Sequence, residues 1–177
     1  MKLEPSKFYK AFAPRVTVLV TTIDVKGRVN AAPFSFAMPL SMNPPLVALG
    51  INYASNTLEN ISETREFVVN IPSNEIIDQV FKCSKTFPKG VSELEKTGLS
   101  KLKSSKVRPP RVAECVAWFE CKLEWMHEAG DHMLVTGSVV EAEVKKELLK
   151  KNGNLDAEKA RVLMHVGGNE FAVPFMI

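Results

Sequence analysis

The residues best suited to chemistry gather in one short run, residues 52–57 (NYASNT), where hydroxyl and amide side chains precede a helical pattern. Ser55 or Asn56 can cap that helix, and Asn56 with Glu59 has the spacing of a capping box. Free N–H groups and the positive end of the helix dipole meet at such a start, so the run suits a phosphate. A well-capped helix without a ligand would have the same pattern.

A second run, residues 32–37 (APFSFA), is interrupted by a proline and rich in small side chains. It offers unpaired backbone groups and room for the close approach of a flat heteroaromatic ring. Phe36 would form a wall of such a site, although phenylalanines are more often part of the core.

Other chemistries find little support in the residue types. The three histidines have no ligand-like spacing and no HExxH or CxxC is present, so we expect no tightly bound metal. Cys115 and Cys121 are expected on one strand, roughly 20 Å apart and beyond disulfide reach. Cys83 is expected to be a structural or surface thiol.

Composition indicates an ordinary globular protein. The chain has 177 residues, 45% hydrophobic and 24% charged, which suits one domain over residues 1–177. A net charge of +3 without a basic and aromatic groove argues against nucleic acid as a partner. The first residues carry no secretory signal and no segment reaches the roughly 20 apolar residues of a membrane span, so we expect a cytoplasmic protein.

The elements that must position these runs are mostly strands. Runs of β-branched and alternating apolar residues predict strands at 16–23, 28–34, 46–51, 67–71, 114–126, 132–144, 161–166 and 171–175. Helical patterns predict helices at 5–12, 57–64, 75–81 and, shorter, near 92–96 and 145–151. Pro33 and Pro39 are expected to stop regular pairing in the segment that follows the second strand.

Neighbouring strands joined by turns, without strand–helix alternation, predict an antiparallel barrel with a few attached helices. No GxGxxG is present, which argues against a Rossmann dinucleotide site. The long polar stretch 82–111 is expected to be a lid or interface arm, with a mobile insertion as the alternative.

Taken in order, several motifs resemble the flavin reductase-like, FMN-binding split-barrel family, and most closely its flavoredoxin-like and archaeal branch. They are residues 15–16 (RV) with 20–22 (VTT), Gly27 with 30–35 (NAAPFS), 41–47 (SMNPPLV), 56–61 (NTLENI) with 66–70 (EFVVN), 87–91 (FPKGV), 130–132 (GDH) and 167–168 (GG). The resemblance covers about residues 15–175. It implies a mainly β fold, an antiparallel Greek-key split barrel with peripheral helices.

The resemblance also implies a homodimer with FMN in a groove at or near the subunit interface. The segment 30–37 would follow the flavin ring, residues 52–57 would receive the ribityl-phosphate arm, and hydroxyl or basic residues of the long loop would approach the phosphate or ring. The FMN-binding residues implied are Asn30, Ala32, Pro33, Ser35, Phe36, Ala37, Asn52, Ser55, Asn56, Thr57, Ser84, Lys85 and Lys89.

His132, in Gly-Asp-His, is the implied catalytic residue close to the flavin, although by itself it would be an exposed turn residue. Lys85 and Lys89 would ordinarily be solvated. Many relatives place Arg-Tyr after the double glycine, where this chain has Asn169-Glu170-Phe171. The resemblance therefore carries no phenol or guanidinium contact to that loop.

The expected function is electron transfer by bound FMN, in a reductase that takes hydride from NAD(P)H and reduces flavin, ferric complexes or another acceptor. The alternative is a flavoredoxin-like carrier without its own nicotinamide site, because no nicotinamide motif is recognisable. A barrel that has lost flavin and binds another ligand is a third possibility. No nucleic acid or membrane partner is expected.

Overall fold

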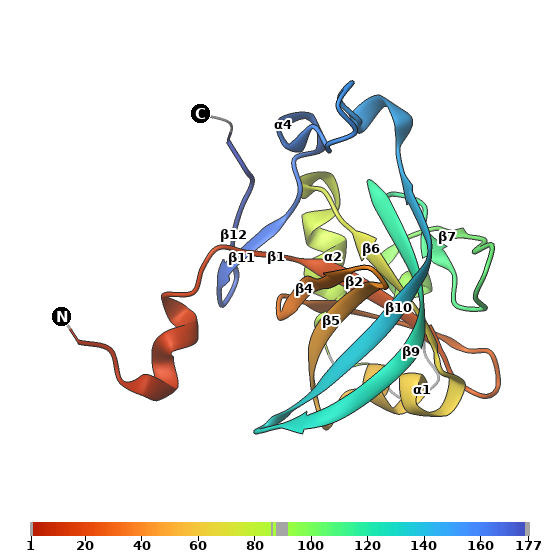
Figure 1. Cartoon of the computed structure of the whole chain (residues 1–177), viewed down its shortest axis with the longest axis horizontal. Coiled ribbons are helices and arrows are strands. Elements are labelled where there is room, and N and C mark those ends of the chain that lie inside the picture. The colour runs from red at the N-terminus through yellow and green to blue at the C-terminus, as the bar shows by residue number, and fades with distance from the viewer. Residues whose placement is uncertain (1, 86, 88–91, 176–177) are drawn as a thin grey trace.

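A seven-stranded antiparallel sheet carries the fold of the computed structural model, which describes residues 2–85, 87 and 92–175. Figure 1 shows the sheet curling around itself as a barrel. In spatial order its strands are β3 (Val29–Phe34), β2 (Val18–Ile23), β6 (Glu66–Ile71), β9 (Ala117–Ala129), β10 (His132–Val144), β5 (Pro45–Asn52) and β4 (Ala37–Met42). The predicted antiparallel, mainly β architecture is confirmed.

Two smaller sheets flank the main one. In the first, β11 (Met164–Gly167) lies between β1 (Arg15–Val16) and β12 (Glu170–Ala172), which joins the start and the end of the chain. The second pairs β7 (Lys101–Leu102) with β8 (Arg111–Val112).

The helices are short and peripheral. They are the α-helices α1 (Asn56–Thr64), α2 (Ile77–Cys83), α3 (Glu93–Thr97) and α4 (Ala157–Ala160), and the 3-10 helices η1 (Pro5–Lys10), η2 (Asn74–Ile76) and η3 (Lys146–Leu148). In Figure 1 η1 stands away from the barrel. Among the described residues, no helix is both long and apolar enough to cross a membrane.

Apolar residues on both faces of β2 and β6 explain why these strands are buried throughout. Leu19 and Val68 face a core shared with α2 and α3, whereas Val20, Phe67 and Val69 face the barrel interior and α1. Because side chains alternate along a strand, a continuous apolar run is what two-sided burial requires.

The prediction that Pro39 stops regular pairing is wrong. Residues 37–42 form β4, which pairs with β5 and has one irregularity between Pro39 and Ser41. β4 is an edge strand, where a proline can be accommodated because half of the backbone groups have no strand to pair with.

The expected positions of the cysteines also need correction. Cys115 precedes β9, which begins at Ala117, so Cys115 and Cys121 do not share a strand. Cys83, Cys115 and Cys121 are all free and buried.

The second half of the segment 82–111 is fixed to the barrel by a buried carboxylate. Glu120, on β9, accepts hydrogen bonds from the backbone N–H groups of Ser105 (2.9 Å) and Lys106 (2.6 Å) and pairs with Arg111 (2.7 Å). Burial pushes the pKa of Glu120 up, but these donors outweigh it and hold the pKa below its ordinary value. The expected short helix near 92–96 is present as α3.

Candidate functional site

Helix α1 begins as the sequence predicts, with Ser55 as its cap. The Ser55 Oγ accepts a hydrogen bond from the Thr57 N–H (3.2 Å), and the Asn52 side chain supports the preceding turn by accepting from the Ala54 N–H (3.0 Å). Asn56 is the first helical residue, so a capping box starting at Asn56 does not form. Asn52 and Asn56 are exposed and Ser55 is partly buried, so this helix start faces solvent.

Asn30 and Thr57 lie behind that surface. Thr57 is fully buried and Asn30 nearly so, and their side chains contact each other (3.0 Å). With its amide turned so that nitrogen meets the carboxylate, Asn30 donates to Glu93 Oε1 (3.1 Å) and accepts from the Thr57 hydroxyl. The Ala31 N–H donates to Glu93 Oε2 (3.1 Å). These groups connect α1, β3 and α3, and they support the helix start from within.

The chain bends between β3 and β4, and the bend presents Phe36 to solvent. Phe36 is 42% exposed, and its carbonyl accepts from the Gly50 N–H (2.8 Å). A side chain at position 50 would place its Cβ 3.1 Å from the Phe36 Cβ, so glycine permits this close approach. Ala32 and Ala37 hold the bend at either end by pairing with Val20 and Leu49.

His132 lies against this bend. The imidazole contacts the Phe36 ring in a tilted arrangement, with centroids 5.3 Å apart and an interplanar angle of 36°, and His132 Nδ1 contacts Asp131 Oδ1 at 2.6 Å. In the ladder between β10 and β5, His132 is directly opposite Asn52. Three segments distant in sequence, the bend, the Gly-Asp-His turn and the start of α1, therefore meet on one surface.

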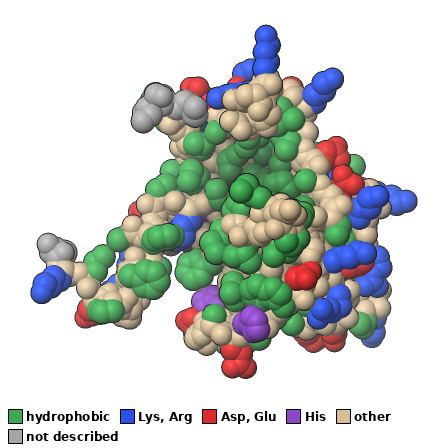
Figure 2. Space-filling view, in the orientation of Figure 1, with side chains coloured by type: hydrophobic (Ala, Val, Ile, Leu, Met, Phe, Trp, Pro, Cys, Tyr) green, Lys and Arg blue, Asp and Glu red, His purple; other side chains and the backbone are tan. Residues whose placement is uncertain are grey.

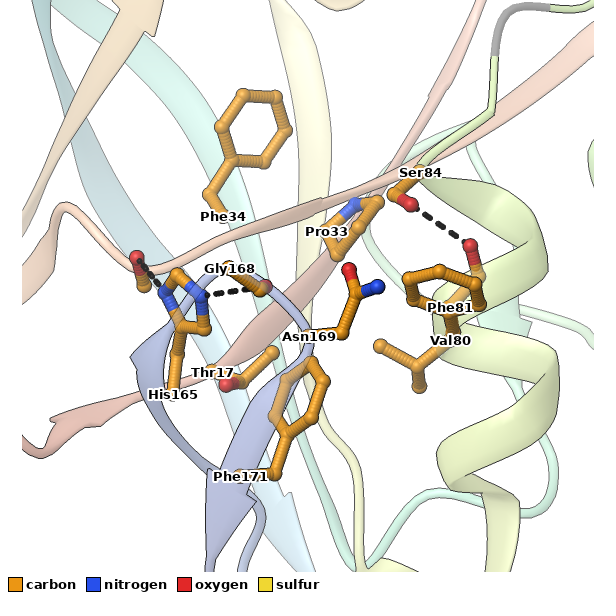
Figure 3. Close-up of a pocket in the computed structure, with 11 residues that line it drawn as sticks. Thr17, Pro33, Phe34, Val80, Phe81, Ser84, His165, Gly168, Asn169 and Phe171 are labelled. Carbon is orange, nitrogen blue, oxygen red and sulfur yellow. Dashed lines mark hydrogen bonds between the residues drawn. The ribbon is translucent and has the colours of Figure 1, made fainter.

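A cavity of about 210 Å³ opens on the other side of the bend, between α2 and the β11–β12 hairpin. Figure 3 shows its lining residues, which are Thr17, Pro33, Phe34, Ser35, Val80, Phe81, Ser84, His165, Gly168, Asn169 and Phe171. Its walls are largely aromatic and aliphatic. The Thr17 hydroxyl, on a residue only 2% exposed, has no hydrogen-bond partner among the described residues, so the wall of the cavity contains a buried unsatisfied polar atom.

Of the predicted binding residues, Pro33, Ser35 and Ser84 line this cavity. The Ser84 hydroxyl donates to the Phe81 carbonyl (2.7 Å). Lys85 is exposed, and its ammonium lies 5.8 Å from the centre of the Phe81 ring. Lys89 lies outside the described residues.

Sequence reasoning missed His165 and Arg15, which the pairing of β1 with β11 places opposite each other. His165 contacts the Ser35 hydroxyl (3.1 Å) and an Arg15 guanidinium nitrogen (3.4 Å). The Arg15 guanidinium also lies over the Phe36 ring, 5.7 Å from its centroid. The cavity and the surface around His132 are thus joined through Ser35, Phe36 and Arg15. The one local signal for His165 was its place two residues before the double glycine.

The loop after the double glycine also contributes to the cavity. Asn169 and Phe171 line the cavity with an amide and a phenyl ring, and the nearby guanidinium comes from Arg15 instead.

Comparisons with known proteins identify one family over most of the chain. The model of the flavin reductase-like domain matches residues 10–168. An uncharacterised protein of Aquifex aeolicus is 33% identical over 167 residues, covering 92% of this chain and 85% of the relative. A flavin reductase of Pseudomonas putida is 32% identical over 134 residues, covering 76% of this chain and 75% of that protein.

Among solved structures, nitrilotriacetate monooxygenase component B from Bacillus cereus superposes with a TM-score of 0.90 at 26% identity, covering 100% of this chain and 96% of the other. The flavoredoxin of Desulfovibrio vulgaris shares the fold, with a TM-score of 0.86 at 22% identity, covering 100% and 95% of the two chains. With the family model matching most of its length, the chain belongs to the flavin reductase-like domain family.

Proposed function

We propose that this protein binds FMN and transfers electrons from NAD(P)H to flavin, ferric complexes or another acceptor. The observation that carries the proposal is the convergence of the α1 start, the Phe36–His132 pair and the cavity beside Ser35. An anionic tail and a flat ring each find a suitable environment within this one surface.

The residues present fit such a cofactor. A solvent-facing helix start with the Ser55 and Asn56 side chains suits a phosphate, and the exposed ammonium of Lys85 is a cation that could approach it. Pro33, Phe81 and Phe171 offer flat apolar walls for a ring. Bound FMN would supply the redox chemistry, so the protein needs to bind, orient and tune it.

His132 is the residue we assign to the reacting side of the site. It is partly exposed, and it is held by Asp131 and Phe36 beside the start of α1. The hydrogen bond from His132 holds the pKa of Asp131 below its ordinary value, so the carboxylate remains available to orient the imidazole.

We also propose that the working unit is a homodimer. A cavity of about 210 Å³ is smaller than the roughly 300–1,000 Å³ of typical ligand sites, so one chain would enclose only part of FMN. Beside the site, Figure 2 shows apolar side chains gathered over the face that carries β4 and the N-terminal segment. Its exposed members include Phe8, Phe12, Phe36, Met38, Leu40 and Met42. Contiguous apolar surface of this kind marks an interface.

The absorption spectrum of the purified protein tests the proposal most directly. We expect yellow protein, or colourless protein that turns yellow and binds one FMN per chain. NADH and NADPH added without oxygen should bleach the flavin absorbance. Protein that cannot take up FMN would refute the flavin function.

A carrier role is the second candidate, favoured by the absence of a GxGxxG motif. It predicts FMN binding and reversible reduction by a redox protein or dithionite, with bleaching by NADH and NADPH too slow for turnover. The relative rates of these reductions decide between the two functions.

A further inference from the structure

His165 makes three polar contacts within the cavity wall. Its Nε2 lies 3.1 Å from the Gly168 carbonyl oxygen, and its Nδ1 lies 3.1 Å from the Ser35 hydroxyl and 3.4 Å from an Arg15 guanidinium nitrogen. Figure 3 shows His165 between the double-glycine turn and the β3–β4 bend. Its ring also stacks on Phe171, with centroids 5.4 Å apart.

These partners determine which ring nitrogen carries the proton. A carbonyl oxygen only accepts hydrogen bonds, so Nε2 must carry a proton to bind Gly168. A guanidinium only donates, so Nδ1 facing Arg15 must be an acceptor. The lone pair therefore lies on Nδ1, because a proton on that nitrogen would face the Arg15 donor.

The same logic fixes the Ser35 hydroxyl. A serine has one proton and two lone pairs. With Nδ1 as the acceptor, the Ser35 proton is directed to the single Nδ1 lone pair, which Ser35 (3.1 Å) shares with the more distant Arg15 nitrogen (3.4 Å). The Ser35 oxygen therefore faces the cavity as an acceptor. A ligand group next to it must donate a hydrogen bond.

Arg15 also contacts the N-terminal segment. One guanidinium nitrogen donates to the carbonyls of Tyr9 (2.7 Å) and Phe12 at the end of η1, while the other meets His165. The N-terminal segment thus contacts Arg15, which in turn contacts the His165 nitrogen that accepts from Ser35.

We propose that His165 is a positioning residue that makes Ser35 a hydrogen-bond acceptor, and that Ser35 recognises the imide N–H at position 3 of the flavin ring. The inference rests on the proposed function. Oxidised isoalloxazine carries a single N–H, at this position, and its other polar ring atoms only accept. If Ser35 accepts this hydrogen bond, the pyrimidine edge of the flavin ring faces Ser35.

The test compares FMN with 3-methyl-FMN, which lacks that donor. Full-length FMN-loaded protein is titrated with 3-methyl-FMN, and displacement is followed by flavin fluorescence. We expect wild type to bind 3-methyl-FMN at least about tenfold more weakly than FMN, the effect of one lost hydrogen bond. Ser35→Ala should reduce this discrimination to less than about threefold.

Two substitutions at position 165 separate positioning from packing. His165→Asn keeps an oxygen near the place of Nδ1 and should retain discrimination. His165→Leu has no acceptor and should lose it. Thermal melting shows independently whether each variant folds. If His165→Leu does not fold, the comparison of His165→Asn with Ser35→Ala still tests the discrimination between FMN and 3-methyl-FMN.

A spectroscopic measurement gives the same information without competition. With FMN labelled with ¹⁵N at position 3, the imide proton should be protected from exchange in wild type and His165→Asn, and exchange faster in Ser35→Ala. Tight FMN binding with equal affinity for 3-methyl-FMN would overturn the inference and leave the proposed function intact. Failure of wild type to bind FMN would overturn both.

Discussion

His132 is held by contacts that a substitution can remove without opening the core. Its partners are the exposed Phe36 ring and the exposed Asp131 carboxylate. We expect His132→Ala to change the melting temperature by no more than a few degrees, because surface contacts contribute little. The rate of flavin reduction by NAD(P)H should fall at least about tenfold, and a loss of roughly 10²–10⁴-fold would be typical of a general acid–base group.

Stopped-flow absorbance and thermal melting measure the two effects. The matched control is His127→Ala, which removes an exposed histidine stacked on Trp125 farther along the same hairpin. It should leave the reduction rate unchanged. A large loss of melting temperature with normal turnover in His132→Ala would contradict the assigned role.

Glu93 is expected to make the free energy of unfolding depend on pH, and the direction follows from the shift of its pKa. Burial raises its pKa above the ordinary value of 4.5, so above that pH the folded chain keeps a proton that the unfolded chain releases. Its contribution to the free energy of unfolding is complete below pH 4.5 and is lost as the pH rises through the raised pKa. Glu93→Gln has no proton to lose, so its stability should change less than that of wild type between pH 4.5 and 7.

Urea unfolding at a series of pH values measures this slope. Glu95→Gln, on the same short helix, is the control, because the hydrogen bond from Lys101 lowers the pKa of Glu95 and its contribution is lost below pH 4.5. Parallel stability curves for wild type and Glu93→Gln above pH 4.5 would show that the buried carboxyl is not responsible.

Among the elements, the segment before β9 depends on one buried ion pair. Arg111 and Glu120 are 6% and 0% exposed, and Glu120 also binds two backbone N–H groups. Glu120→Ala leaves Arg111 partly unpaired and those donors unsatisfied, and it should cost about 3–5 kcal/mol in the free energy of unfolding.

Equilibrium urea unfolding gives that value. Glu143→Ala provides the comparison, because Glu143 contacts the same guanidinium but its side chain is 57% exposed. We expect a cost of about 1 kcal/mol or less for it. Equal losses in the free energy of unfolding for Glu120→Ala and Glu143→Ala would mean that the burial of Glu120 does not determine the loss of stability.

Strands with strong local patterns could be predicted from the sequence, and contacts between distant strands could not. The bounds of β10 were predicted as observed, since an apolar strand follows a glycine turn. β4 was missed because Pro39 removes a donor, and only the position of β4 at the sheet edge makes that tolerable.

The same limit applies to the candidate site. Ser55 and His132 stand in local motifs and could be named in advance. Arg15, Thr17 and His165 meet the site only because β1 pairs with β11 across most of the chain. The burial of Thr57 likewise results from its tertiary contact with Asn30, which a capping pattern does not reveal.

For the molecule as a whole, the exposed apolar face predicts self-association. Met38 is 54% exposed and Leu40 38%, both on the edge strand β4. Met38→Asp combined with Leu40→Lys places charges where we expect the second subunit, so the double variant should sediment as a monomer at concentrations where wild type is a dimer.

Sedimentation velocity at micromolar concentration decides this, with FMN content measured on the same samples. Val25→Asp is the control, since Val25 is 70% exposed in the turn between β2 and β3. If wild type is monomeric, the homodimer proposal is wrong. If the double variant stays dimeric, the interface lies elsewhere.

The three interior thiols make the native chain almost inert toward alkylating reagents at neutral pH. Burial raises the pKa of Cys83 to about 11 and raises the pKa values of Cys115 and Cys121 as well, so the nucleophilic thiolate is scarce as well as shielded. A single cysteine introduced on the surface could therefore carry a fluorophore with little background. In the unmodified chain, the slow rate of maleimide incorporation would measure how often the barrel opens on a large scale.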